Sequence, residues 1–378
     1  MLCVVTVATM WMAVNAQQNI GVNTAVIVSP NVQDGVVELF LSMPNAQSVV
    51  VQGDWLDAPV AMSRREDGVW CYRSDELLPG MYTYTYNVDG VTMIDPSCVY
   101  SVRDVSTLFS YFIVSGGVAD NYVINDVSHG TVSSRWYYSD AMGYDRRLTV
   151  YTPAGYETGE LRYPVLYLLH GMGGDETAWQ ELGRASVILD NMIASGSVEP
   201  MIVVMTNGNV AQQAAPGHSL RGLVPVRFDE PRTCNGEFEA AFGEIISFVD
   251  TQYRTQPDAA HRAIAGLSMG GYHSMYISAN WPRMFDYVGL FSPAIEARGV
   301  HAVYDDIDAK LAMQRDGNMR LYWIAIGCDD FLYKEVADFR DRLDALHFPY
   351  TYRESKGGHR WSNWRMYLTE FLPLLFKN

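Results

Sequence analysis

The chain has 378 residues, which exceeds the usual size of one compact domain and leads us to expect two. Hydrophobic residues make up 48% of it and charged residues 19%, a balance typical of a globular protein and unlike that of a disordered chain. The net charge of −16 excludes nucleic acid as an expected partner, because phosphate backbones are bound by fields of Lys and Arg.

Residues 1–18 are predicted to be a signal peptide. An apolar stretch from Leu2 to Val14 runs into Val14-Asn15-Ala16, whose small residues resemble a signal-peptidase site. A positively charged start is missing, which a truncated signal peptide would explain. The protein is therefore expected to be exported, either secreted or periplasmic. No later apolar run approaches the ~20 residues that a membrane span requires, so none is expected.

Residues 24–116 are predicted to form a small all-β sandwich. Short β-rich runs, such as Val36–Leu41, Ser48–Gly53 and Tyr82–Val88, alternate with turn signals at the spacing typical of that architecture. Asp89-Gly90 directly follows the third of these runs and indicates a tight hairpin turn.

This sandwich resembles the immunoglobulin-like N-terminal modules of glycogen-branching and debranching enzymes and of some bacterial esterases. In that family the module sometimes binds glucan and often only packs on its enzyme, and we expect structural roles for Trp55 and Trp70. The resemblance rests on Gly53-Asp54-Trp55, Asp67-Gly68-Val69-Trp70, Leu78 to Tyr84, Val88-Asp89-Gly90 and Asp95-Pro96.

The cysteines predict no metal site. Cys3 falls in the signal peptide, and the spacings of the other four match no zinc-binding pattern. Export would permit a disulfide, for which Cys71 and Cys98 are the one pair considered. Buried free thiols are the default expectation.

After Gly116-Gly117, residues 117–135 are expected to be a linker, and from Trp136 to the end strands alternate with helices. Continuous apolar runs suit strands that are buried on both faces, so a mostly parallel sheet covered by helices is predicted. The expected strands are Arg147–Tyr151, Pro164–Leu169, Met201–Thr206, Ala263–Ala265, Tyr287–Phe291 and Leu321–Ile326, and the expected helices include Ala185–Ala194 and Phe242–Tyr253.

A nucleophile motif lies in the middle of this second part. Gly266-Leu267-Ser268-Met269-Gly270 matches G-x-S-x-G, in which Ser occupies a strained turn between a strand and a helix. The bare motif is weak evidence, because composition alone produces it often. Its context is specific, since His261–Ala265 suits the strand and Tyr272–Ala279 the helix. Residues 136–378 are therefore predicted to form an α/β-hydrolase domain with Ser268 as nucleophile.

The acid and base of such a site are expected after the nucleophile, in the order Asp or Glu and then His. Asp329 and Asp330 follow the strand Leu321–Ile326, and spacing alone does not choose between them. His359 follows the β-rich run Tyr350–Glu354, at the same edge of the sheet, and is the predicted base.

An oxyanion hole is predicted from two backbone N–H groups. Leu168-Leu169-His170-Gly171-Met172-Gly173-Gly174 follows a buried strand and has the glycine content for close backbone approach. We expect one donor from Met172 in this loop and the other from Met269, directly after the nucleophile.

The second half, Trp136 to Phe376, resembles the feruloyl and acetyl-xylan esterases of carbohydrate esterase family 1, an esterase D-like group, and within it the two-domain enzymes of gut Bacteroides-like bacteria. The resemblance rests on His170 to Gly174 with Glu176 and Trp179, Asn207-Gly208-Asn209, Arg262 to Ser274, Asp330 to Tyr333 and Gly357 to Trp361.

This resemblance implies a serine esterase that needs no metal or organic cofactor. It favours Asp330 over Asp329 as the acid, and it suggests Trp179 and Trp361 as substrate-binding residues. The implied substrate is a polysaccharide or oligosaccharide ester, most simply a feruloyl ester on xylan. Acetyl-xylan esterase, sugar acyltransferase and, from another class, a non-catalytic carbohydrate-binding protein remain alternatives, and the oligomeric state stays open.

Overall fold

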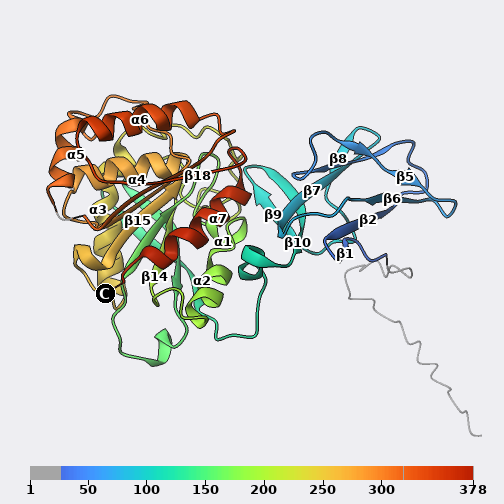
Figure 1. Cartoon of the computed structure of the whole chain (residues 1–378), viewed down its shortest axis with the longest axis horizontal. Coiled ribbons are helices and arrows are strands. Elements are labelled where there is room, and N and C mark those ends of the chain that lie inside the picture. Colours follow the sequence, from blue (N-terminus) through green and yellow to red (C-terminus); the bar gives the residue numbers. More distant parts are fainter. Residues whose placement is uncertain (1–26, 318, 378) are drawn as a thin grey trace, which may run out of the picture.

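The computed structural model describes residues 27–317 and 319–377, so the predicted signal peptide lies outside the described residues. The chain forms two small antiparallel sheets first and then one large sheet flanked by helices (Figure 1). The large sheet and its helices make up the part that carries the predicted active-site residues.

The two small sheets lie between Asn31 and Val114. Every strand pair in them is antiparallel, which confirms the predicted small all-β part. Asp89 and Gly90 form the tight turn between β7 and β8, and both have a positive φ. One sheet has the order β1 (Asn31–Gln33), β2 (Val36–Ser42), β6 (Val69–Arg73), β5 (Ser63–Arg64); the other has β4 (Val60–Ala61), β3 (Val49–Gly53), β7 (Gly80–Val88), β10 (Thr107–Val114), β9 (Ser101–Asp104), with β8 (Val91–Met93) beside β7.

Alternate residues of these strands bury one shared core. In β2, Val37, Leu39 and Leu41 are fully buried while their neighbours are not, as the period of a strand requires. Trp70 donates its indole N–H to the Met43 carbonyl, and Trp55 donates to the Tyr72 hydroxyl. Both tryptophans thus have structural contacts. Cys71 and Cys98 are free thiols, so the disulfide considered for them is absent.

The large sheet has eight strands, and the mostly parallel arrangement predicted from the apolar runs is confirmed. Only its first two strand pairings are antiparallel. The order is β11 (Thr131–Ser139), β12 (Tyr144–Thr152), β14 (Ile202–Thr206), β13 (Val165–Leu169), β15 (Arg262–Leu267), β16 (Tyr287–Phe291), β17 (Leu321–Gly327), β18 (Thr351–Ser355).

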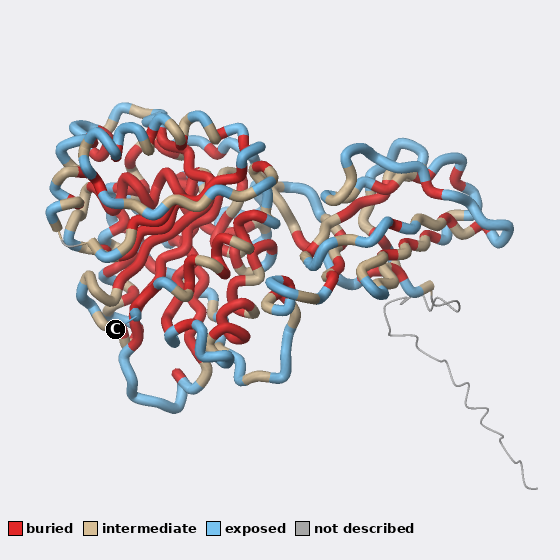
Figure 2. Tube along the Cα trace, in the orientation of Figure 1, coloured by how far each residue is buried: buried red, intermediate tan, exposed pale blue. Residues whose placement is uncertain are grey.

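Helices cover both faces of this sheet, and the central strands are buried throughout (Figure 2). Successive residues of a strand therefore enter different cores: Tyr167 packs in one hydrophobic cluster, and Leu166 and Leu168 pack in the other. The first core includes α3 (Glu237–Gln252), α4 (Met269–Asn280), α5 (Ile307–Arg315) and α6 (Tyr333–Ala345); the second includes α1 (Ala178–Glu181), α2 (Ala185–Ala194) and α7 (Trp361–Phe371).

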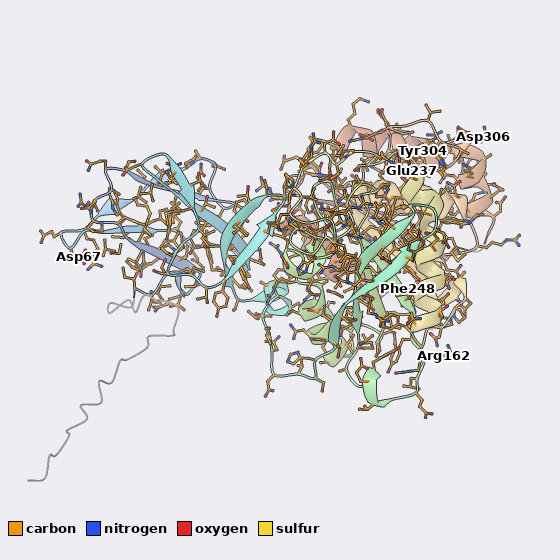
Figure 3. All side chains as sticks on the ribbon, turned by 180° about the vertical axis from the view of Figure 1, so that it is seen from behind. Asp67, Arg162, Glu237, Phe248, Tyr304 and Asp306 are labelled. Carbon is orange, nitrogen blue, oxygen red and sulfur yellow. The ribbon has the colours of Figure 1, made fainter. Side chains whose placement is uncertain are left out.

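The β-rich part packs directly against the second of these cores. Met81 and Val102 belong to the same buried cluster as α1, α2 and α7, and so does Tyr122 in the segment that connects the two parts. The buried guanidinium of Arg365 on α7 donates to the carbonyls of Met81 (2.9 Å) and Leu182 (2.7 Å), and so joins the two parts. The opposite end of the β-rich part, marked by Asp67, lies far from the α/β part (Figure 3).

Within residues 27–317 and 319–377, no helix combines the length and apolar character needed to cross a membrane.

Candidate active site

Ser268 lies in a sharp turn between the end of β15 and the start of α4. Its backbone is strained, with φ 53° and ψ −115°, and its N–H donates to the Phe291 carbonyl at 2.9 Å. A Cβ on Gly266 would lie 2.4 Å from the Gly270 backbone, and one on Gly270 would lie 2.3 Å from the Leu169 carbonyl oxygen. Both glycines of the motif are therefore required by close approach of the backbone.

His359 and Asp330 come to Ser268 from later strand ends. His359 lies between β18 and α7, and its Nε2 is 2.9 Å from Ser268 Oγ. Its Nδ1 is 3.0 and 2.9 Å from the two carboxylate oxygens of Asp330, which follows β17. The Asp330 side chain is 0% exposed and the His359 ring 15% exposed. The structure thus brings together three of the predicted site residues in one hydrogen-bonded chain.

Asp329 lies outside this chain. It is exposed, and one of its carboxylate oxygens accepts a hydrogen bond from the Gly357 backbone N–H at 3.2 Å. Asp330 instead turns inward, where the Leu332 N–H also donates to it at 2.9 Å. Of the two candidate acids, only Asp330 can hold the His359 ring in place.

The arrangement suits nucleophilic attack by a serine hydroxyl. When the His359 Nδ1–H donates a hydrogen bond to the Asp330 carboxylate, Nε2 carries no proton and is free to accept the proton of Ser268 Oγ. The Phe331 and Trp364 rings pack against the imidazole, with centroids 4.5 and 4.9 Å away. These apolar neighbours limit water around the base and strengthen its hydrogen bonds.

The two predicted oxyanion donors lie beside Ser268. Met172 and Met269 line the same cavity as the nucleophile. Met269 is the first residue of α4, so its backbone N–H has no partner within the helix. The positive end of the helix dipole also favours negative charge at this point.

His170 fixes the orientation of the loop that holds Met172. The Gly208 N–H donates to His170 Nε2 at 2.9 Å, so that nitrogen carries no proton, and Nδ1 donates to the Gly171 carbonyl at 2.7 Å. The Gly171 carbonyl and the Met172 N–H belong to one planar peptide unit. The sequence indicates that His170 lies in the loop from His170 to Gly174, which we call the oxyanion loop. Its contacts as a positioning residue are visible only in the fold.

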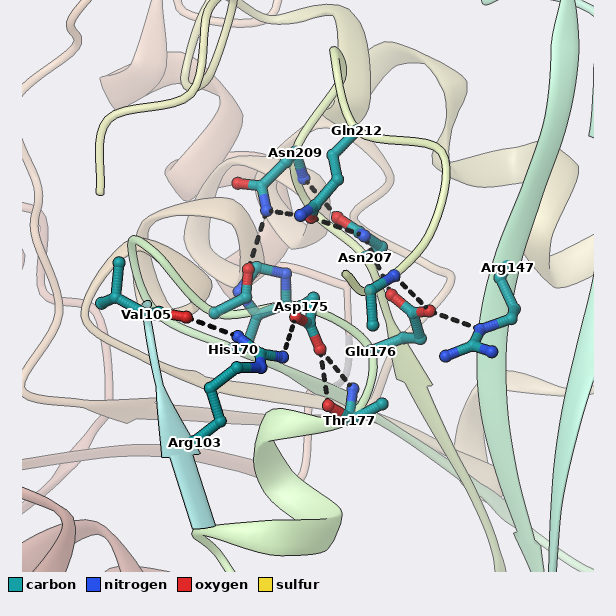
Figure 4. A network of polar contacts seen from close by, with 12 residues as sticks. Arg103, Val105, Arg147, His170, Asp175, Glu176, Thr177, Asn207, Asn209 and Gln212 are labelled. Carbon is teal, nitrogen blue, oxygen red and sulfur yellow. Dashed lines mark hydrogen bonds and ion pairs between the residues drawn. The ribbon is translucent and has the colours of Figure 1, made fainter. Parts of the chain in front are cut away.

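A buried polar network supports the same loop (Figure 4). The Asn209 side chain donates to the Gly174 carbonyl at 2.8 Å, at the end of the loop. The Glu176 carboxylate accepts hydrogen bonds from Arg147 (2.6 Å), Asn207 (2.9 Å) and the Ala215 N–H (2.8 Å). Glu176 and Asn207-Gly208-Asn209 belong to the motifs that carry the family resemblance, and in the structure they support the loop.

Burial lowers the pKa of His170 from 6.5 to about 4. Between these values the unfolded chain binds one proton more than the folded one, so the free energy of unfolding falls as the pH falls. We expect the difference in unfolding free energy between wild type and His170→Asn to change by about 3 kcal/mol from pH 6.5 to 4, with wild type losing more.

Urea unfolding at a series of pH values measures this difference. The exposed His218, replaced as His218→Asn, controls for the loss of an imidazole elsewhere. Parallel pH profiles for wild type and His170→Asn would contradict the prediction.

Ser268 and His359 open onto a cavity of about 350 Å³. Its walls are largely aromatic and apolar, and Trp361 is one of the residues that line it. Trp179 does not line it. It is 1% exposed, donates to the Leu169 carbonyl, and packs edge-on beneath Trp361 at 5.3 Å. The prediction that Trp179 binds substrate is corrected accordingly: it supports Trp361.

The sequence did not point to several residues that line the cavity. Phe228 and Arg298 come from loops, and Asp104 and Val105 come from the β-rich part. No local pattern marks any of them, because their position depends on how distant segments pack. Among the described residues, no group of three His, Cys, Asp or Glu side chains is arranged to hold a metal ion.

Comparison with known proteins gives one family match. The model of the esterase family matches residues 139–375, which covers the large sheet from the end of β11 and the helices α1 to α7. A curated relative, the endo-1,4-beta-xylanase/feruloyl esterase of Xylanibacter ruminicola, is 29% identical over 353 residues. These residues are 91% of this chain and 45% of the relative, so the chain spans about half the length of that protein.

Two solved structures show similar folds. A ferulic acid esterase matches with a TM-score of 0.52 and 28% identity, over 65% of this chain and 97% of its own. The enterobactin esterase of Shigella flexneri matches with a TM-score of 0.62 over 91% of this chain and 94% of its own. At 16% identity the latter likeness shows the fold alone, and it extends over both the β-rich and the α/β parts.

Proposed function

The chain belongs to the esterase family, and we propose that it is a serine carboxylic ester hydrolase that releases ferulate from feruloylated xylan or arabinoxylan. The observation that carries the proposal is the hydrogen-bonded chain from Ser268 through His359 to Asp330, at the mouth of a mostly apolar cavity. The substrate class is supported by the xylanase/feruloyl esterase and the ferulic acid esterase to which the chain is similar.

In the first step, Ser268 Oγ attacks the ester carbonyl while His359 Nε2 takes its proton. The backbone N–H groups of Met172 and Met269 donate hydrogen bonds to the oxyanion of the tetrahedral intermediate. Each donor stabilises it by about 3 kcal/mol. Asp330 stabilises the imidazolium. His359 then gives the proton to the leaving sugar hydroxyl, and the acyl group stays on Ser268.

In the second step, His359 takes a proton from water, whose oxygen attacks the acyl-enzyme carbonyl. The intermediate collapses to the free acid, and the proton returns to Ser268 Oγ. The chemistry of both steps is carried by side chains and backbone groups of this chain, with no cofactor invoked.

The shape of the cavity favours an aromatic acyl group over acetyl. Phe228, Phe331 and Trp361 line it, and aromatic side chains suit the packing of a hydroxycinnamate ring. A volume of about 350 Å³ lies within the range of small-molecule sites and exceeds what an acetyl group would fill.

We propose, in addition, that the enzyme acts outside the cytoplasm on polysaccharide or oligosaccharide esters. Residues 1–18 support this as a signal-like segment. Sequencing the N-terminus of the protein recovered from its producing cells is expected to show that this segment has been removed, and an intact segment would contradict export by this route.

A substrate panel tests the proposed reaction. Wild type is expected to hydrolyse methyl ferulate and feruloylated arabinoxylan oligosaccharides with a kcat/KM at least about 10-fold above that for acetylated xylan, because only the aromatic acyl group fills the cavity. Hydrolysis products are quantified by chromatography. A preference for acetylated xylan would favour an acetyl-xylan esterase. Transfer of the acyl group to an added oligosaccharide would favour an acyltransferase, and the absence of any turnover would favour a binding protein.

A further inference from the structure

The β-rich part of the chain contributes to the cavity beside Ser268. Asp104 and Val105 line this cavity together with Ser268 and His359. Asp104 is the last residue of β9, and Val105 is the first of the two residues that turn the chain into β10. This hairpin lies at the border with the α/β part (Figure 1). The hairpin turn, which we call the β9–β10 turn, thus faces the nucleophile.

Arg103 holds the turn in place. One guanidinium nitrogen lies 2.5 Å from the Asp175 carboxylate, and another donates to the Val105 carbonyl at 2.7 Å (Figure 4). The Asp175 side chain is 1% exposed and also accepts hydrogen bonds from the N–H and hydroxyl of Thr177. A charge-assisted hydrogen bond to a buried carboxylate is strong, so it holds the turn beside the loop that ends at Gly174.

Val105 has an unusual backbone for its residue type. Its φ is 52°, in the left-handed region that two-residue hairpin turns fill with Gly, Asn or Asp and that β-branched residues avoid. Its side chain packs on the oxyanion loop, because a Cβ on Gly173 would lie only 2.7 Å from a Val105 methyl group. A strained residue in contact with a reactive loop is the kind of outlier that marks functional sites.

The carboxylate of Asp104 is a hydrogen-bond acceptor that has room for a further donor. Among the described residues, no side chain donates a hydrogen bond to its carboxylate, although it is half-buried and lines the cavity. Burial raises the pKa of Asp104, while Arg103 and the Val105 N–H favour its charged form. A partly desolvated carboxylate gains most from a donor brought by the ligand.

We propose that the β9–β10 turn is part of the substrate site, with Asp104 accepting a hydrogen bond from a hydroxyl group of the ester and Val105 forming the wall next to the oxyanion loop. The proposal rests on the proposed esterase function. The hydroxyl has two sources in a feruloyl sugar ester, the phenol of the acyl group and the sugar, and matched substrates distinguish them.

The test compares selectivity ratios of wild type and Asp104→Ala. The first ratio is kcat/KM for methyl ferulate over methyl 3-methoxycinnamate, which lacks only the phenol hydroxyl. The second ratio is kcat/KM for a feruloyl arabinose ester over methyl ferulate, which lacks the sugar. Asp104→Ala is expected to lower one ratio by about 10-fold or more, as loss of a charge-assisted hydrogen bond does. A fall in the first ratio assigns the phenol, and a fall in the second the sugar.

Asp67→Ala, at the far end of the β-rich part, is the matched control and should leave both ratios unchanged (Figure 3). Val105→Gly separates a site role from a structural one. Glycine relieves the strained φ, so the melting temperature should hold or rise, while kcat/KM for methyl ferulate falls by about 3-fold or more because the wall is lost.

If wild type hydrolyses these esters, two outcomes would overturn the role of the turn and leave the esterase function intact. One is that both ratios stay unchanged in Asp104→Ala, and the other is that kcat/KM stays unchanged in Val105→Gly. A wild type that hydrolyses none of them would overturn the proposed function first and this role with it.

Discussion

Replacing Ser268 with alanine is expected to lower kcat for ester hydrolysis by about 10⁵-fold or more, because the acyl group then has no oxygen to which it can transfer. His359→Ala should cost about as much, since Ser268 Oγ and His359 Nε2 act as one unit at 2.9 Å. The double variant is expected to fall no further than either single one. The residual rate that remains comes from the oxyanion donors and substrate binding.

Release of p-nitrophenol from its acetate ester and of ferulate from methyl ferulate measures these rates. Ser278→Ala, a buried serine on the same helix α4, is the matched control and should keep kcat within about 2-fold of wild type. Thermal melting shows whether each variant is folded. Additive losses in the double variant, or a folded Ser268→Ala with wild-type activity, would contradict the assignment of Ser268 as nucleophile.

The turn that holds Ser268 could be predicted from sequence because its structural requirements are local. The strand before Ser268, the helix after it and the two glycines that permit close backbone approach all lie within one short stretch. The same holds for His359, which lies in the short loop between β18 and α7. The parallel sheet could be predicted as well, because strands buried on both faces read as continuous apolar runs.

The remaining parts of the site depend on packing between distant segments, which no local pattern records. Trp179 belongs to a family motif beside the oxyanion loop, but Trp361, far along the chain, covers it and takes the place facing the cavity. The β9–β10 turn lies beside the cavity because the two parts of the chain pack together, and the ion pair between Arg103 and Asp175 connects them there. Both outcomes follow from tertiary contacts rather than from residue type or spacing.

Amide substitutions at Asp329 and Asp330 are expected to have very different effects on kcat. Asp330→Asn is expected to lower kcat by about 10⁴-fold, because the amide NH₂ can donate a hydrogen bond to His359 Nδ1 and so favour the imidazole tautomer with its proton on Nε2, which removes the acceptor that Ser268 needs. Asp329→Asn should stay within about 3-fold of wild type. An asparagine oxygen can still accept the hydrogen bond of the Gly357 N–H, which is the contact that Asp329 makes.

The two variants differ by one position and by the same single-atom change, so each controls for the other. Initial rates on methyl ferulate give kcat and KM for both, and KM is expected to change little in Asp330→Asn because the carboxylate lies behind His359 rather than in the cavity. A large loss in Asp329→Asn with activity retained in Asp330→Asn would reverse the assignment. Equal small losses would mean that neither acid orients His359, and the base would then act without a carboxylate partner.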